Sequence, residues 1–178
     1  MKTIFITAAL LLSVPQVACA QQFWEPAALL SDMFPGSDTV TPLTLTLDED
    51  AKVDGKMRLG MKLKDSYTVY RAYTGDHLDG YVVIDEQIGQ HEPITFAVQI
   101  DPAGTVIRQE VLVYREKYGS EVRDARFRKQ FVGKTATDPL KVGSDVRIIS
   151  GATYSSKAMA VGVKRALWLV GRVRMNRL

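Results

Sequence analysis

The chain has 178 residues, of which 46% are hydrophobic and 24% are charged, and its formal net charge at pH 7 is +3. This length and composition are typical of one globular domain with a sizeable core. A charge so close to neutral, with both signs interspersed along the chain, argues against a protein that binds nucleic acid.

The N-terminal residues have the layout of a secretory signal peptide. Lys2 precedes an apolar run at 4–14, and the small residues Ala18-Cys19-Ala20 follow it. A run of about eleven apolar residues is too short to span a bilayer. We therefore expect cleavage after Ala20 and a mature N-terminus at Gln21.

The single cysteine, Cys19, lies in the segment that cleavage would remove. The mature chain would then have neither disulfide nor thiol chemistry. Loss of Lys2 without any acid would change the formal charge from +3 to +2. The alternative is a lipoprotein with Cys19 lipidated, but Gln16 stands where Leu is normally required.

The next elements predict an antiparallel sheet. A short amphipathic helix is expected at 25–34, followed by an edge strand at 41–47 and a solvated acidic loop at 48–50. Four more strands rich in β-branched and aromatic residues are predicted at 67–73, 80–85, 94–100 and 106–114. Because the connections are short, we expect one α+β domain with helices packed on an antiparallel sheet.

Asp124 is expected to cap a second helix that buries Phe127 and Phe131 and closes at Gly133. The basic residues around it are expected to form a solvated face or, alternatively, a docking patch for an acidic redox partner. They are Arg123, Arg126, Arg128 and Lys129.

The longest helical pattern begins near Ser155. Apolar residues at 159, 163, 166, 167 and 170 recur at helical spacing, while Lys157, Lys164 and Arg165 take other faces, which predicts about four turns. Thr153 then lies at or just before a helix N-terminus, a position that favours a bound phosphate.

The turn before this helix consists of small residues. Gly151 permits a tight or left-handed turn, and Ala152 keeps the approach to Thr153 uncrowded. Taken alone, the turn favours the simpler interpretation, in which the hydroxyl groups of Thr153 and Ser155 only cap the helix.

The complete string is more specific. Ser150-Gly151-Ala152-Thr153-Tyr154-Ser155 resembles the covalent flavinylation motif of the FMN-binding domain family, which is typified by flavin-bearing subunits of the Rnf complex and of the sodium-pumping NADH:quinone reductase. The resemblance implies that a Mg-dependent flavin transferase, with FAD as donor, joins FMN to the Thr153 hydroxyl through a phosphoester. The family often has Asp three residues before the first Ser, where this chain has Arg147; the nearest acid is Asp145.

Two further stretches carry the resemblance. They are Gly89-x-x-Glu92-Pro93-Ile94-x-Phe96 with Ile100-Asp101-x-x-Gly104, and Phe127-x-x-Gln130-Phe131-x-Gly133-Lys134. The resemblance covers 78–168, so we divide the chain into a signal peptide at 1–20, an N-terminal part at 21–77 and the FMN-binding core with its C-terminal helix at 78–178.

The resemblance places a flavin-facing loop at 114–121. Gly119 allows close backbone approach, and Tyr114 and Tyr118 offer stacking faces for the flavin ring. The stretch that carries this part of the resemblance is Tyr114-Arg115-Glu116-x-Tyr118-Gly119-x-Glu121, in which Arg115 can stabilise negative charge on the reduced flavin. The alternative is an ordinary strand exit with solvated charges.

Other chemistries have little support in the sequence. The two histidines, His77 and His91, are far apart and have no cysteine beside them, which argues against a transition-metal site. The chain has neither the G-x-S-x-G of a hydrolase nor the G-x-G-x-x-G of a nicotinamide site. We expect His91 to be a surface turn residue; the alternative is a proton donor to the flavin.

The sequence therefore predicts an exported, periplasmic electron carrier with FMN attached covalently to Thr153. The expected partners are a flavin transferase and a membrane-bound electron-transfer subunit. The alternatives are a non-redox flavin-binding, sensory or assembly module, and a small flavin reductase with its own substrate.

Overall fold

The computed structural model describes residues 20–175, so Cys19 and nearly all of the predicted signal peptide lie outside the described residues. The predicted α+β domain is confirmed: six strands form one antiparallel sheet in the order β1-β6-β5-β4-β3-β2. The strands are β1 (Gln21–Gln22), β2 (Thr39–Thr46), β3 (Ser66–Thr74), β4 (His77–Ile88), β5 (Pro93–Ile100) and β6 (Val106–Tyr114). The five longer strands match the predicted ones, and β2 lies at the edge as expected.

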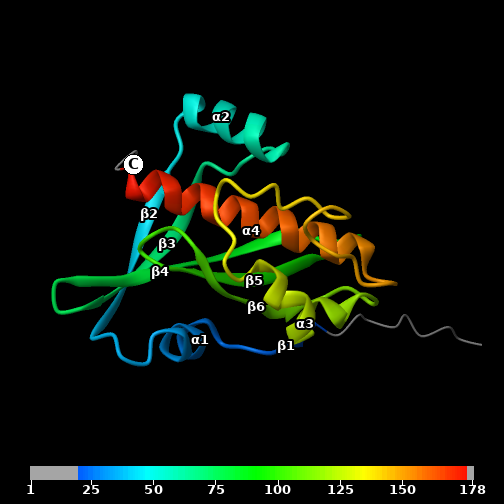
Figure 1. The fold of residues 1–178 in the computed structure, drawn as a ribbon, viewed down its shortest axis with the longest axis horizontal. Coiled ribbons are helices and arrows are strands. Elements are labelled where there is room, and N and C mark those ends of the chain that lie inside the picture. The colour runs from blue at the N-terminus through cyan, green and yellow to red at the C-terminus, as the bar shows by residue number, and fades with distance from the viewer. Residues whose placement is uncertain (1–19, 176–178) are drawn as a thin grey trace, which may run out of the picture.

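Helices cover both faces of this sheet (Figure 1). The long helix α4 lies along one face, and α1 lies on the other. The helices are α1 (Pro26–Met33), α2 (Glu49–Leu59), α3 (Ala125–Arg128) and α4 (Thr153–Arg174), and two 3₁₀ turns, η1 (Ser120–Arg123) and η2 (Lys129–Phe131), flank α3.

The alternation of side chains along β5 explains the two layers. Ile94, Phe96 and Val98 are fully buried in the cluster under α4, whereas Ala97 belongs to the cluster under α1. Because successive strand residues point to opposite faces, an almost wholly apolar strand is the expected centre of a sheet covered on both sides.

Helix α4 is longer than predicted, with 22 residues rather than about four turns. Arg165 is also not on an outer face: its side chain is 2% exposed and points to the sheet. There its guanidinium donates to the Asp85 carboxylate at 2.6 Å and to the Glu86 carbonyl at 2.8 Å. A partner 80 residues away thus allows this cation to be buried.

The acidic stretch expected as a solvated loop is instead the start of α2. The Asp48 carboxylate accepts a hydrogen bond from the Ala51 N–H at 2.7 Å and caps the helix, which ends at Gly60 in a left-handed conformation. Only Ala51 and Gly55 of this helix are buried. A helix with so small a buried face lacks the apolar periodicity by which helices are recognised.

The basic residues around α3 do not form one solvated face. Asp124 caps α3 as predicted, through a 2.8 Å bond from the Arg126 N–H. Arg128 forms an ion pair with Glu110, and the guanidinium of Arg123 lies 3.2 Å from the ring centroid of Phe23. Arg126 forms an ion pair with Asp124 at 3.6 Å, so three of the four cations are engaged with groups of the domain itself.

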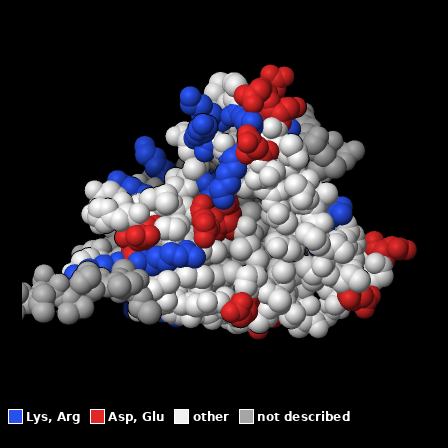
Figure 2. Space-filling model, turned by 180° about the vertical axis from the view of Figure 1, so that it is seen from behind, with Lys and Arg blue, Asp and Glu red and all other residues white. Residues whose placement is uncertain are grey.

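Charges of both signs are interspersed on the face shown in Figure 2. None of the helices within residues 20–175 combines the length and the apolar character needed to cross a membrane.

Candidate functional site

The segment from Ser150 to Ser155 lies where α4 begins. Ser150 and Gly151 are exposed, Ala152 is buried, and Thr153 is the first residue of α4. Gly151 has φ +83°, and an added Cβ would meet no atom within 4 Å. This left-handed turn therefore requires glycine for its backbone conformation and leaves open space above it.

The start of α4 is not capped by a side chain, which differs from the alternative in which Thr153 and Ser155 cap the helix. The cap residue is Ala152, and no side chain of the described residues accepts from the first turn. The Thr153 hydroxyl, half-exposed, makes no hydrogen bond to another described side chain or backbone group. The unsatisfied N–H groups and the positive end of the helix dipole create an environment that favours an anion beside this hydroxyl.

Ser155 anchors the helix start to β6 instead of capping it. Its hydroxyl lies 2.8 Å from the hydroxyl of Tyr114, which in turn donates to the Tyr118 carbonyl at 2.5 Å. Because a phenol has one proton, Ser155 must donate to Tyr114 in this arrangement. Burial raises the pKa of the Tyr114 phenol, so it stays neutral at physiological pH.

This geometry corrects one expectation for the loop at 114–121. The ring of Tyr114 is 2% exposed and lies in the core under α4, so it does not offer an open stacking face. Tyr118, which is 71% exposed, does present an open ring. The sequence places Tyr114 at the end of a strand, whereas its contact with Ser155 depends on how α4 packs against the sheet.

Gly119 lies against the start of α4, whereas the close approach expected from the sequence was to the flavin ring. Its φ is +89°, and an added Cβ would lie 2.8 Å from the Ser155 hydroxyl oxygen and 3.3 Å from the Ala152 Cα. Contacts below about 3.0 Å force neighbouring atoms to move, so any larger residue would displace the turn that carries Thr153.

Arg115 and Glu116 are engaged elsewhere in this structure. The Arg115 guanidinium donates to the Pro93 carbonyl at 3.0 Å and to the Thr95 hydroxyl at 2.9 Å. Glu116 accepts the backbone N–H of His91 at 2.6 Å and holds the turn between β4 and β5. Both side chains therefore bond to β5 and this turn rather than to the start of α4, and His91 is an exposed turn residue as expected.

Sequence reasoning missed the residue that holds the segment before Ser150. Gln130 accepts from the Arg147 N–H at 2.7 Å and donates to the Arg147 carbonyl at 3.4 Å. The signal was present as the Gln of the Phe127-x-x-Gln130-Phe131 motif, but the pattern alone does not show a partner 17 residues away. Asp145 instead accepts from Lys134 at 3.1 Å and from the Lys141 N–H at 2.7 Å.

An open cavity of about 490 Å³ adjoins this segment. It lies between η1, α3 and the residues 147–149 that lead to the helix start, and Phe127 and Ile149 are among its apolar walls. Its volume is within the range of small-molecule and cofactor sites. No cluster of three or more His, Cys, Asp or Glu side chains in residues 20–175 is arranged to hold a metal ion.

Comparisons with known proteins agree with the motif and the fold. The model of a family described as "FMN-binding domain" matches residues 89–168. One subunit of a proton-translocating ferredoxin:NAD(+) oxidoreductase complex from Clostridium ljungdahlii is 31% identical over 159 residues, which cover 85% of this chain and 80% of that protein. The crystal structure of NqrC from Shewanella oneidensis shares the fold, with a TM-score of 0.51, 19% identity and coverage of 80% of this chain and 87% of that chain.

Proposed function

Because the chain belongs to the FMN-binding domain family, we propose that it is an exported electron-carrier flavoprotein with FMN attached to Thr153. The observation that carries this proposal is the hydroxyl of Thr153 at an uncapped helix start. A hydroxyl used as a cap would be occupied by the backbone N–H groups of its own helix. Here the hydroxyl and these N–H groups are both available to one phosphate.

The residues around Thr153 fit a tethered FMN. The first-turn N–H groups of α4 can donate hydrogen bonds to phosphate oxygens. The open space above Gly151 admits the group, and the cavity beside Ile149 gives room for a ring. The exposed ring of Tyr118 can provide a stacking face.

The chain's own residues would hold the attachment point in place. Tyr114 and Ser155 tie the helix start to the end of β6, and Gly119 allows the loop to approach it closely. Bound FMN accepts two electrons and can release them one at a time, which suits a relay. A covalent tether would prevent loss of the cofactor outside the cytoplasm.

The proposed attachment is a phosphoryl transfer in which Thr153 is the nucleophile. Its Oγ1 forms a bond to the phosphorus on the riboflavin side of FAD. The pyrophosphate bond breaks, AMP leaves, and the hydroxyl proton is lost. The proposed catalyst of this step is a Mg-dependent flavin transferase, which activates the threonine hydroxyl for attack.

Export is proposed from the layout of residues 1–20. Cleavage after Ala20 would leave the described strands whole, because β1 begins at Gln21. N-terminal sequencing of the extracytoplasmic fraction tests this: Gln21 is expected. A lipidated Cys19 would instead indicate a membrane-tethered carrier, and Met1 would contradict cleavage.

The proposed partner is a membrane-bound electron-transfer subunit. The relative from Clostridium ljungdahlii is named as part of a proton-translocating oxidoreductase complex. Copurification from solubilised membranes tests the proposal, with the flavin-free Thr153→Ala chain as a comparison for whether assembly requires the cofactor.

Attachment is tested by coexpression with a flavin transferase, followed by denaturation and peptide mass spectrometry. Wild-type protein should carry FMN on the peptide containing Thr153, and Thr153→Ala should lose the denaturation-resistant fluorescence. Stability should change by about 0.5 kcal/mol or less, because Thr153 makes no cap bond and Ala is the better helix former. Thr153→Ser retains a hydroxyl and should retain labelling.

Ser120→Ala is the matched control, since it removes an exposed hydroxyl from the neighbouring loop and leaves Thr153 unchanged. It should be labelled as fully as the wild type. An adduct that persists in Thr153→Ala would contradict the attachment site. A wild-type chain that stays colourless with active transferase and FAD would favour a non-redox module.

A further inference from the structure

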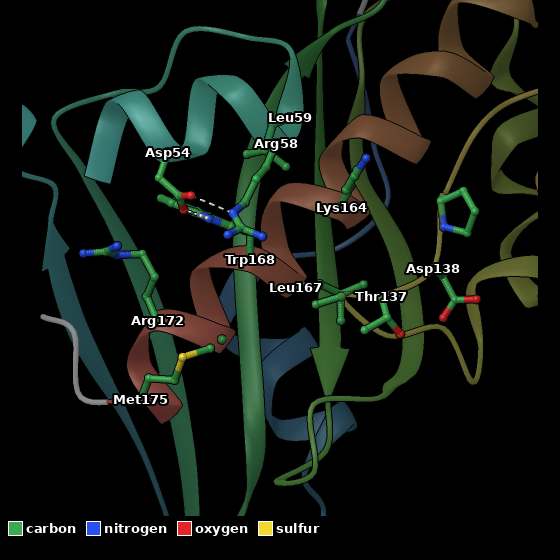
Figure 3. Close-up of a pocket in the computed structure, with 13 residues that line it drawn as sticks. Asp54, Arg58, Leu59, Thr137, Asp138, Lys164, Leu167, Trp168, Arg172 and Met175 are labelled. Atoms are coloured by element: carbon green, nitrogen blue, oxygen red, sulfur yellow. Dashed lines mark hydrogen bonds and ion pairs between the residues drawn. The ribbon is translucent and has the colours of Figure 1, made fainter. Parts of the chain in front are cut away.

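A second cavity lies at the opposite end of α4 from Thr153. It has a volume of about 380 Å³ and lies between α2, the last turns of α4 and the loop 136–139 (Figure 3). Thr153 and Trp168 are 15 residues apart, which corresponds to about 22 Å along a helix axis. This cavity is therefore separate from the proposed flavin site.

The floor of the cavity is one stripe of α4. Lys164, Leu167, Trp168, Gly171 and Met175 line it at spacings of three and four residues, which places them on one face of the helix. An added Cβ at Gly171 would meet no atom within 4 Å, so the missing side chain leaves open space in the floor.

The indole of Trp168 is held in one orientation. Its Nε1–H donates to the Asp54 carboxylate at 3.1 Å. On α2, Gly55 packs so closely that an added Cβ would lie 3.1 Å from the indole ring. A fixed aromatic side chain in a concave, partly apolar site is typical of a pocket for a small organic molecule.

The charged groups around the cavity favour an anion. Asp54 is paired with Arg58 at 2.7 Å, and Asp138 is paired with Lys134 at 3.3 Å, so both carboxylates on the wall already have cation partners. Lys164 is half-buried and forms no ion pair with another residue of the described chain.

Arg172 adds a second cation beside the indole. Its guanidinium lies 5.4 Å from the ring centroid of Trp168, and its Nε is buried with no hydrogen-bond partner among the described residues. The lining thus combines an apolar floor with cations that lack anionic partners within residues 20–175.

We propose that this cavity binds a small aromatic carboxylate, with its ring on Trp168 and Leu167 and its carboxylate paired with Lys164. The cavity has the volume of a small-molecule site, and the positive charge at its rim selects an anion over a neutral ring. This site is independent of the flavin, so the Thr153→Ala chain should bind the same ligand with the same affinity.

Isothermal titration calorimetry of the full mature chain tests the proposal with 2-naphthoate as the probe. The matched neutral probe is 2-naphthalenemethanol, which has the same ring system and no charge. Saturable binding of 2-naphthoate is expected, with an affinity about tenfold higher than that of the alcohol, the usual effect of one charge-assisted hydrogen bond.

Three variants locate the site. Gly171→Leu should fill the cavity and weaken binding at least tenfold while the fold is retained, since Leu is a better helix former than Gly. Lys164→Gln should weaken 2-naphthoate binding about tenfold and leave the alcohol unchanged. Lys157→Gln is the matched control, because this exposed lysine lies two turns earlier on α4 and outside the cavity.

The proposal is overturned if 2-naphthoate gives no saturable heat at concentrations up to about 1 mM, or if the alcohol binds equally well. It is also overturned if Gly171→Leu, with a circular dichroism spectrum like that of the wild type, binds 2-naphthoate normally. A wild-type chain that binds 2-naphthoate but acquires no flavin in the presence of active transferase and FAD would contradict the attachment proposal alone.

Discussion

The contact between Tyr114 and Ser155 should determine how firmly the start of α4 is held. Tyr114→Phe keeps the buried ring and removes only its hydroxyl, which contacts Ser155 at 2.8 Å and the Tyr118 carbonyl at 2.5 Å. The change removes two hydrogen bonds and leaves the 3% exposed Ser155 without its acceptor. At about 1 kcal/mol for each bond, plus the cost of a buried unsatisfied hydroxyl, we expect a loss of about 2–3 kcal/mol.

The measurement is urea unfolding in the flavin-free Thr153→Ala background, which separates stability from cofactor content. Ser155→Ala should cost only about 1 kcal/mol, because Tyr114 retains its bond to the Tyr118 carbonyl. The double variant should cost less than the sum of the two single variants, by about 1 kcal/mol. Additive effects, or a loss below about 0.5 kcal/mol in Tyr114→Phe, would refute this account.

In the wild-type background, Tyr114→Phe should also slow flavin attachment while Thr153 remains its site. Labelling rates are measured with purified transferase and FAD, well below the urea concentration at which either chain unfolds. An unchanged rate in a clearly destabilised variant would show that the Tyr114 contact supports the fold but does not position the acceptor.

Three further changes test other parts of the fold. Gly119→Ala should lower the free energy of unfolding in urea by about 2 kcal/mol and slow flavin attachment. Gly133→Ala is its control, because Gly133 has φ +81° but open space around it; this variant should lose about 1 kcal/mol and leave attachment unchanged. Arg165→Met should lower the free energy of unfolding by about 3 kcal/mol, because it leaves the buried Asp85 carboxylate with one cation partner, and Asp85→Leu in the same chain should restore part of that loss. A hydrogen bond from a backbone N–H lowers the pKa of Asp138, so the ionised carboxylate stabilises the fold above its ordinary pKa, and this stabilisation should be lost as the pH falls below about 4. The urea midpoint of Asp138→Asn should therefore fall less steeply than that of the wild type over this pH range. Parallel curves for the two chains would contradict the assignment.

The sheet could be predicted from the sequence because its signals are local. The strands β3 to β6 alternate or run continuously in β-branched and aromatic residues, and Asp101 and Gly104 form the hairpin turn between β5 and β6. The position of Thr153 followed in the same way from a small-residue turn before a periodic apolar pattern.

The missed features all depend on partners that are distant in sequence. Arg165 looked like a surface cation because its partner Asp85 lies on another element. Helix α2 is polar almost throughout and contacts α4 through Gly55, a residue that disfavours helices. The stacking role expected for Tyr114 was wrong because a strand-end tyrosine can face either side of the sheet, and only the packing of α4 decides which.

The buried ion pair gives α4 a fixed register on the sheet. Apolar contacts are non-directional, so residues such as Val163 and Ala166 specify the register of the helix less sharply than a hydrogen-bonded ion pair does. The Arg165 guanidinium fixes the helix in one register, because it donates to three oxygens on β4, at Asp85, Glu86 and Gln87. Since α4 is continuous from its first residue to the second cavity, this fixed position acts with the Tyr114–Ser155 contact at one end and the Trp168–Asp54 contact at the other to orient both sites.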